Sequence, residues 1–364
     1  MNYKNKKIIF VTGSLADGGA ERVMSILATM CAEAGADVTL VVMREKKYIY
    51  HVSDKVNCIQ IKTGSKKFKT ISRIKQLRSI LKKSDDSTVI PFLPLITLYT
   101  MIANMGINKR VITSERSDPR ISFWAKNLSW KDRVGILIMR KMGLYNLAEL
   151  MVFQTPDAQS YYNKNRQKRS CIIPNPLDTD KLPKRYEGER EKRIVAAGRF
   201  SEEKNFSLLI EAFSIFHKKH PEYNMTIYGE GALRNQLERE IKKYDLMSII
   251  KLPGFASNLP EEINKAAMYV STSNHEGISN SMLEALGMGI PSIVTDCPVG
   301  GARMFVKTDE NGILIPMNDC DALVEAMSKI AEDRAYAEKI SANATKIREE
   351  ISAKNICKMW LELV

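Results

Sequence analysis

The sequence predicts an α/β fold made of two doubly wound domains, and three observations lead to that prediction. Short apolar runs of strand length alternate with helix-like segments along the chain, a pattern typical of parallel sheets covered by helices on both faces. The 364 residues are too many for one ordinary hydrophobic core. A stretch rich in proline and charge, residues 171–193, interrupts the alternation, which restarts after it.

The strands are expected where the apolar runs lie. In the first half we expect them at residues 7–12, 37–43, 56–61, 88–92, 110–114 and 150–155, and in the second half at 193–198, 224–229, 248–252, 267–272 and 290–296. The interruption leads us to expect an N-terminal domain at 1–180, a C-terminal domain at 181–345, and a terminal helix at 346–364 that returns to the first domain. Ligands of open α/β sheets bind beyond the carboxyl ends of the strands, so the loops after the strands are the places to search for a site.

The composition is that of an ordinary soluble protein, with 44% hydrophobic and 27% charged residues. No apolar run is long enough to span a membrane, and the first apolar run is too short for the core of a signal peptide. The six cysteines are widely scattered without a CxxC pair, which indicates neither a zinc site nor a disulfide framework. We therefore expect a reduced, cytoplasmic location.

The charge is distributed unevenly. Residues 1–170 hold 30 Lys and Arg against 13 Asp and Glu, a net charge of +17, whereas the remainder holds 25 against 29, a net charge of −4. The basic excess therefore belongs to the first half. It implies an anionic partner there, namely nucleic acid, an anionic membrane or a phosphate-bearing acceptor.

The first loop of interest, TGSLADGGAERVMSILA at residues 12–28, follows the first strand and opens a helix near Ala20. Gly13, Gly18 and Gly19 remove side chains where a phosphate could approach the free N–H groups of that helix. The loop lacks the Lys-Ser/Thr ending of a Walker A motif and is not GxGxxG. Taken alone, it fits a simple turn equally well.

The second loop, GRFSEEKN at residues 198–205, also joins a strand to a helix. Arg199 and Lys204 are five residues apart at the mouth of the expected strand, where two cations suit a diphosphate. The alternative is ordinary surface charge.

The third loop, EGISNSMLEALGMG at residues 276–289, predicts a helix from about 279 to 286, capped by Ser279 or Asn280. Glu276 precedes this helix and Glu284 lies on its second turn. The two carboxylates would accept hydrogen bonds from sugar hydroxyls. Donors would come from the backbone N–H groups at the helix start, which belong to Gly277, Ile278, Ser279 and Asn280. For a single glutamate, a solvated helix position or a cap would be explanation enough.

These stretches, in this order, resemble the retaining family-4 glycosyltransferases of the GT-B fold over nearly the whole chain. The residues that carry the resemblance are GGAE (18–21), SERSDP (114–119), IPNPLD (173–178), GRFSEEKN (198–205), YGEG (228–231), LPGF (252–255), EGISNSMLE (276–284) and GGAR (300–303). The resemblance implies two Rossmann-like doubly wound domains facing a central cleft, the first binding the acceptor and the second the nucleotide sugar. It points to bacterial N-acetylgalactosaminyl- and hexosyltransferases of lipid-linked glycan or capsule assembly.

The resemblance also implies roles. Arg199 and Lys204 would bind the donor diphosphate and steady the leaving group, and Glu276 with the N–H groups after it would hold the transferred sugar. Glu284 would bind the ribose. Gly254 and Phe255 would frame the base, expected to be uracil, and Gly18 and Gly19 would admit the diphosphate from the other domain. Retention is implied, with the acceptor attacking on the leaving-group face, so Glu276 is not assigned as a nucleophile.

No cofactor or metal is expected beyond the UDP-sugar. The acidic pair of Asp178 and Asp180 matches the DxD pattern that binds metal in another glycosyltransferase fold, but it lies in a proline-rich stretch where short acidic residues suit turns. The sequence does not choose among glucose, galactose and their N-acetylated amino forms as the donor sugar.

The basic half is expected to meet the acceptor and a membrane. Residues 66–84 and 123–147 predict basic amphipathic helices, which suit an anionic lipid surface, although their apolar faces could instead cover the sheet. The resemblance implies a glycan acceptor on undecaprenyl diphosphate at the inner face of the cell membrane. The acceptor or membrane contacts are assigned to Lys126, Arg140, Lys141 and Arg116, the last standing where many relatives have a histidine. A soluble or teichoic acid acceptor is the alternative, and nucleic-acid binding is disfavoured because no known module is present.

Overall fold

The computed structural model describes residues 3–16, 18–46, 48–63, 68–116, 118–120, 130–141 and 143–364. The chain divides into two compact units, of which unit 1 comprises Met1–Pro176 and Ala353–Val364, and unit 2 comprises Leu177–Ser352. We expected the boundaries after residues 180 and 345. The two ends of unit 2 meet, since the Leu177 N–H donates to the Ile351 carbonyl at 2.9 Å.

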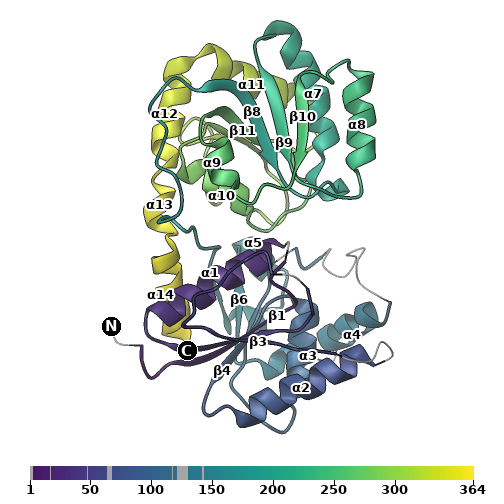
Figure 1. The fold of residues 1–364 in the computed structure, drawn as a ribbon, viewed down its shortest axis with the longest axis vertical. Coiled ribbons are helices and arrows are strands. Elements are labelled where there is room, and N and C mark those ends of the chain that lie inside the picture. The colour runs from purple at the N-terminus through teal and green to yellow at the C-terminus, as the bar shows by residue number, and fades with distance from the viewer. Residues whose placement is uncertain are drawn as a thin grey trace. The chain divides into compact units, whose positions relative to one another are not determined.

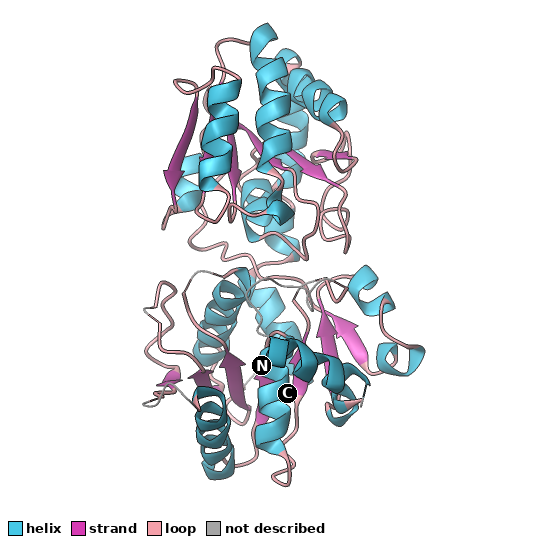
Figure 2. Ribbon diagram, turned by 90° about the vertical axis from the view of Figure 1, so that its right-hand side faces the viewer, coloured by secondary structure: helices cyan, strands magenta, loops and turns pink. Residues whose placement is uncertain are grey.

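Unit 1 is built on parallel strands in the order β3-β2-β1-β4 and β5-β6-β7. Two parallel bridges, Val89 to Val111 and Phe92 to Ser114, join β4 to the β5 side, so the two groups continue one another. The strands are β1 (Lys7–Thr12), β2 (Asp37–Val42), β3 (Asn57–Gln60), β4 (Thr88–Pro91), β5 (Ile112–Ser114), β6 (Leu150–Phe153) and β7 (Ser170–Ile172). The central residues of β1, β2, β4, β5 and β6 are buried because both faces carry helices, whereas the edge strands β3 and β7 are partly exposed (Figures 1 and 2).

The helices of unit 1 form two groups. Helix α2 packs against α3 and α3 against α4, whereas α1 packs against the C-terminal helix α14 (Figure 1). Right-handed crossovers explain this grouping, because α1 connects strands in one direction along the sheet and α2, α3 and α4 in the other. The bounds are α1 (Gly19–Glu33), α2 (Lys69–Lys83), α3 (Pro94–Asn104), α4 (Trp130–Lys141), α5 (Pro156–Ser160), α6 (Lys164–Gln167) and α14 (Ala353–Leu363), with a 3₁₀ turn at Leu144–Leu147.

Unit 2 has one parallel sheet in the order β10-β9-β8-β11-β12-β13, the 3-2-1-4-5-6 order of a dinucleotide-binding fold. The strands are β8 (Glu191–Ala197), β9 (Asn224–Tyr228), β10 (Ile250–Gly254), β11 (Ala266–Ser271), β12 (Ser292–Thr295) and β13 (Ile313–Ile315). The helices are α7 (Phe206–Lys219), α8 (Arg234–Lys243), α9 (Leu259–Ile263), α10 (Asn280–Gly287), α11 (Cys320–Glu332), α12 (Arg334–Ala344) and α13 (Ile347–Glu350), with a 3₁₀ turn at Glu202–Lys204. Apolar residues of β8, β9 and β11 pack with α7 and α11 in the core.

The eleven predicted strands are all present, with ends that differ by a few residues. The prediction missed β7 and β13, which are three residues long and so give little pattern to detect. Residues 69–83 are helical as expected. The N-terminal part of the second expected basic helix, residues 123–129, lies outside the described residues.

Candidate functional site

The strand order of unit 2 reverses between β8 and β11, and the loops after these two strands hold the second and third sequence motifs. Such a switch point leaves a crevice at the carboxyl edge of the sheet. Hydrogen bonds connect the loop after β8 to the loop after β11. The Thr272 hydroxyl donates to the carbonyls of Lys204 and Asn205 at 3.0 Å each, and the Asn274 N–H donates to the Glu203 carbonyl at 2.8 Å.

An ion pair forms where these loops meet. The ammonium of Lys204 lies 2.5 Å from Oε2 of Glu276, and the hydroxyl of Ser273 donates to the same oxygen at 2.9 Å. The two charged side chains are only 17% and 22% exposed, so solvent screens this pair less than it would a surface pair. The structure therefore brings together two of the residues to which we assigned chemistry.

Helix α10 is tied to the ends of the same strands. Its cap is Ser279, whose hydroxyl accepts from the Met282 N–H at 3.4 Å. In its first turn the Ser281 hydroxyl lies 2.8 Å from the phenol oxygen of Tyr269 on β11 and 3.4 Å from the Ala197 carbonyl on β8. Burial raises the pKa of Tyr269 well above its usual range, so this phenol stays neutral. The carboxylate of Glu284, one turn further on, is 4% exposed.

The loop after β12 holds the backbone around Glu276. The Glu276 N–H donates to the Pro298 carbonyl at 3.0 Å, and the Val299 N–H donates back to the Glu276 carbonyl at 3.2 Å. Gly301 packs so closely that an added Cβ would stand 1.6 Å from the carbonyl oxygen of Gly277. Beyond Gly277, Ile278 and Ser279 are buried and Asn280 is half-buried.

Glycines bring the neighbouring loops to the same edge of the sheet. Gly229 has a φ of +146°, and a Cβ there would meet the Gly198 carbonyl at 1.9 Å. Gly254 has a φ of +94°, and its carbonyl accepts from the Gly229 N–H at 2.8 Å. Next to it the ring of Phe255 is 54% exposed, so a flat group could stack on it.

Arg199 follows β8 on the same edge of the sheet as the ion pair. Its side chain is exposed, and among the described residues it forms no ion pair. The sequence placed Arg199 and Lys204 in one role because both flank the helix start. The structure pairs the partly buried Lys204 with Glu276 and leaves Arg199 exposed.

The glycines predicted in unit 1 lie at the start of α1. Gly18 is the N-cap residue of this helix and Gly19 its first residue. A Cβ on Gly18 would meet Oε2 of Glu21 at 1.8 Å, and the Ser14 hydroxyl lies 3.4 Å from Oε1 of the same carboxylate. A carboxylate therefore lies beside this helix start, and diphosphate binding there stays a prediction.

Arg116 is buried inside unit 1, with 7% of its surface exposed. Its guanidinium lies 4.5 Å from the ring centre of Phe92 and 5.5 Å from that of Trp360 on α14. It donates to the Ile173 carbonyl and to Oδ1 of Asn175, at 3.3 Å each. Burial lowers its pKa to about 9. Its predicted contact with an acceptor is untested.

The other predicted acceptor or membrane contacts cannot be placed. Lys126 lies outside the described residues, and so do the side chains of Arg140 and Lys141, whose backbone belongs to α4.

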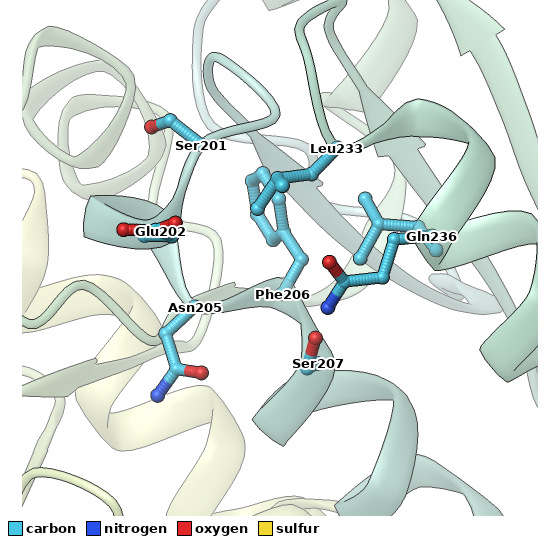
Figure 3. Close-up of a pocket in the computed structure, with 8 residues that line it drawn as sticks. Ser201, Glu202, Asn205, Phe206, Ser207, Leu233 and Gln236 are labelled. Atoms are coloured by element: carbon cyan, nitrogen blue, oxygen red, sulfur yellow. The ribbon is translucent and has the colours of Figure 1, made fainter. Parts of the chain in front are cut away.

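A cavity of about 170 Å³ lies beside the Lys204 loop (Figure 3). It is lined by Ser201, Glu202, Asn205, Phe206, Ser207, Leu233, Gln236 and Leu237. None of the predicted site residues lines it. Within the described ranges, no group of three or more His, Cys, Asp and Glu is arranged to hold a metal ion. Asp178 of the DxD match instead lies 3.3 Å from the ammonium of Lys181.

The sequence analysis missed Thr272, Ser273 and Gly301, which orient the ion pair and the loop that carries it. Two of these are hydroxyl residues directly after the apolar run of β11. A hydroxyl at the carboxyl end of a strand is a weak signal, because it also suits a simple turn. Gly301 lies in the GGAR stretch of the resemblance, which was given no role, and its close approach to Gly277 could not be read from the sequence.

Three comparisons bear on this geometry. Residues 178–347 match the family model described as Glycosyl transferases group 1. An alpha-1,4-N-acetyl-D-galactosaminyltransferase of Campylobacter jejuni, whose name gives a diNAcBac-PP-undecaprenol glycan as acceptor, is 24% identical over 367 residues, which cover 98% of both chains. A poly(glycerol-phosphate) alpha-glucosyltransferase of Bacillus subtilis is 31% identical over 188 residues, 52% of this chain and 27% of the relative. The crystal structure of Anabaena Alr3699/HepE in complex with UDP and glucose has a TM-score of 0.82 and 17% identity, over 98% of this chain and 99% of that one.

Two parallel, doubly wound units and the likeness to the Anabaena structure over nearly the full length define the class of this protein as GT-B. Residues 178–347, which make up most of unit 2, match the family of glycosyl transferases group 1, and the comparisons support a glycosyltransferase. No described helix is both long and apolar enough to cross a bilayer.

Proposed function

We propose that this glycosyltransferase moves a hexose or an N-acetylhexosamine from a UDP-sugar to a glycan carried on undecaprenyl diphosphate, with retention of configuration. The observation that carries the proposal is the Lys204–Glu276 pair at the switch point of unit 2, together with the buried Glu284 on α10. It combines a cation for phosphate with carboxylates for sugar hydroxyls on one edge of one sheet. The UDP in the Anabaena structure supports the choice of nucleotide.

Each of these residues would have its own task. Lys204 would neutralise the charge that gathers on the departing diphosphate, which lowers the barrier where charge develops. Glu276 would accept hydrogen bonds from the transferred sugar, and Glu284 from the ribose. Arg199, which is exposed in the free protein, would turn toward the diphosphate when the donor binds. The exposed ring of Phe255 would stack on the base.

The acceptor and the location belong to the same proposal. The Campylobacter relative, aligned over 98% of both chains, supports an acceptor linked to undecaprenol. An enzyme with such an acceptor would work at the cytoplasmic face of the cell membrane, held there as a peripheral protein by its basic half. The Bacillus relative, with 31% identity over half of this chain, supports a teichoic acid acceptor as the second candidate.

The donor is tested by a hydrolysis screen over UDP- and GDP-sugars, followed by product analysis with extracted lipid-linked acceptor and with poly(glycerol phosphate). We expect turnover of one UDP-hexose or UDP-N-acetylhexosamine, and loss of about 100-fold in turnover for Lys204→Ala. Lys219→Ala is the matched control, since this exposed lysine ends α7 at the opposite edge of the sheet. Equal losses in both variants, or turnover of GDP-sugars alone, would contradict the proposal.

A further inference from the structure

One carboxylate oxygen in the candidate site accepts from two donors. Oε2 of Glu276 lies 2.5 Å from the ammonium of Lys204 and 2.9 Å from the hydroxyl of Ser273. The first donor is the cation that the proposed function assigns to the donor diphosphate. In the free protein, Glu276 therefore binds the group that a phosphate would need.

The backbones on both sides of this pair are fixed, so the partners can change only through their side chains. Lys204 is held by its N–H, which donates to the Ser201 carbonyl at 3.1 Å, and by its carbonyl, which accepts from Thr272. Glu276 is held by its two backbone bonds to the loop after β12. The lysine side chain is long and flexible and can follow a new partner.

Ser273 is the rigid member of the cluster. It is 2% exposed, and its carbonyl accepts from the hydroxyl of Thr295 on β12 at 2.6 Å. Its hydroxyl can thus keep hold of the Glu276 carboxylate when the lysine leaves. Without that hydroxyl, the half-buried carboxylate would depend on the lysine alone, because a buried charge needs a partner.

We propose that Lys204 and Glu276 form an exchange pair: when a nucleoside diphosphate binds, the Lys204 ammonium leaves the Glu276 carboxylate and pairs with the diphosphate. Ser273 meanwhile keeps the carboxylate in place for the transferred sugar. This inference rests on the proposed function, since it takes Lys204 as the ligand of the diphosphate. Ser273 is then a positioning residue. A diphosphate carries more negative charge than one carboxylate and so attracts the Lys204 ammonium more strongly.

The exchange has opposite consequences for two substitutions. In Glu276→Gln the competing charge is gone, so the Kd for UDP should fall by about three- to tenfold, even though transfer is lost. In Ser273→Ala the carboxylate holds the lysine more firmly, so the Kd for UDP should rise several-fold.

The test is a double-mutant cycle on the full-length protein, with UDP binding measured by calorimetry. When Glu276→Gln is already present, Ser273→Ala should leave the Kd unchanged, because the hydroxyl acts only through the carboxylate. Ser273→Thr, which keeps the hydroxyl, should bind UDP as the unsubstituted protein does. Urea unfolding midpoints show whether each variant is folded, and Glu276→Gln tests the exchange without any change at Ser273.

Three results would overturn the inference. Ser273→Ala could change the Kd by the same factor with and without Glu276→Gln, which would indicate a merely structural role. Glu276→Gln could leave UDP binding unchanged or weaken it. If the protein binds no UDP, the proposed function is wrong as well. If UDP binding depends on Lys204 but the effects of Ser273→Ala and Glu276→Gln are simply additive, only the exchange is wrong.

Discussion

At the scale of single residues, Arg116 of unit 1 has an unusual environment for a cation. Its guanidinium is buried against the neighbouring rings of Phe92 and Trp360, and its Nε and Nη2 atoms have no hydrogen-bond partner among the described residues. Each aromatic contact contributes about 0.5–2 kcal/mol. Taking a cation out of water costs several kcal/mol, which these contacts and two hydrogen bonds of 3.3 Å do not fully offset.

Replacing Arg116 by a neutral side chain of similar length should therefore stabilise the protein. We expect Arg116→Met to raise the free energy of unfolding by about 1–2 kcal/mol, measured by urea denaturation, because the desolvation cost disappears while the rings stay packed. Arg116→Ala should instead lower it by about 2 kcal/mol, since a cavity would form beside the two rings. If Arg116→Met is less stable than the unsubstituted protein by more than about 1 kcal/mol, stacking outweighs desolvation at this position.

At the scale of elements, the site depends on loops that approach more closely than side chains would permit. Gly301 illustrates this best, because a Cβ there would stand 1.6 Å from the Gly277 carbonyl and 3.2 Å from the Cα of Ile278. These two residues connect Glu276 to the cap of α10. The contact between the two loops thus determines where both the carboxylate and the helix start lie.

Gly301→Ala should push these loops apart, and backbone atoms can yield only by moving together. We expect a loss of about 2–3 kcal/mol in the free energy of unfolding and of at least about 100-fold in sugar transfer. Gly188→Ala is the matched control in unit 2, since the atoms nearest to its Cβ belong to the end of the Tyr186 side chain, which can turn aside, and not to the backbone. Full activity in Gly301→Ala would show that the loop after β12 does not set the geometry of the site.

The sequence allowed the elements to be predicted well, because strand positions follow from local apolar runs. It also allowed the pairing of the loops that carry Lys204 and Glu276 to be anticipated, since both follow strands of one parallel sheet and resemble a known arrangement. Three-dimensional neighbours were harder to foresee. The burial of Arg116 depends on Trp360, which belongs to a helix at the far end of the chain. Arg199 is exposed whereas Lys204, on the same loop, pairs with Glu276, and the sequence gives no sign of which of the two cations would do so.

At the scale of the whole molecule, charge is the property that distinguishes the two halves. The net charge of +17 in residues 1–170 contrasts with −4 in the rest. Helix α2 concentrates this excess, with six Lys and Arg and no acidic residue in its sequence KTISRIKQLRSILKK. Lys75, Lys82 and Lys83 are exposed, as are Phe68 and Ile71 at the start of the helix, while Leu77 and Leu81 are buried. The basic amphipathic helix thus buries one face within unit 1, where it packs against α3, and presents cations and apolar groups on the other.

This distribution predicts salt-dependent binding to anionic bilayers. Each exposed lysine near an anionic surface contributes about 1 kcal/mol, so reversing the charge of Lys75, Lys82 and Lys83 to Glu should weaken binding to phosphatidylglycerol vesicles at least about 100-fold. The measurement is co-sedimentation at low salt, and binding should vanish near 0.5 M salt because screening removes the attraction.

The control reverses the exposed Lys218, Lys219 and Lys251 of unit 2, an equal change in net charge. If both triple variants lose binding equally, net charge alone drives adsorption and α2 has no special part in it. If neither loses binding, or if neutral phosphatidylcholine vesicles bind as well as anionic ones, the anionic membrane surface is not the partner of the basic half, and a soluble or teichoic acid acceptor becomes the better explanation of its charge.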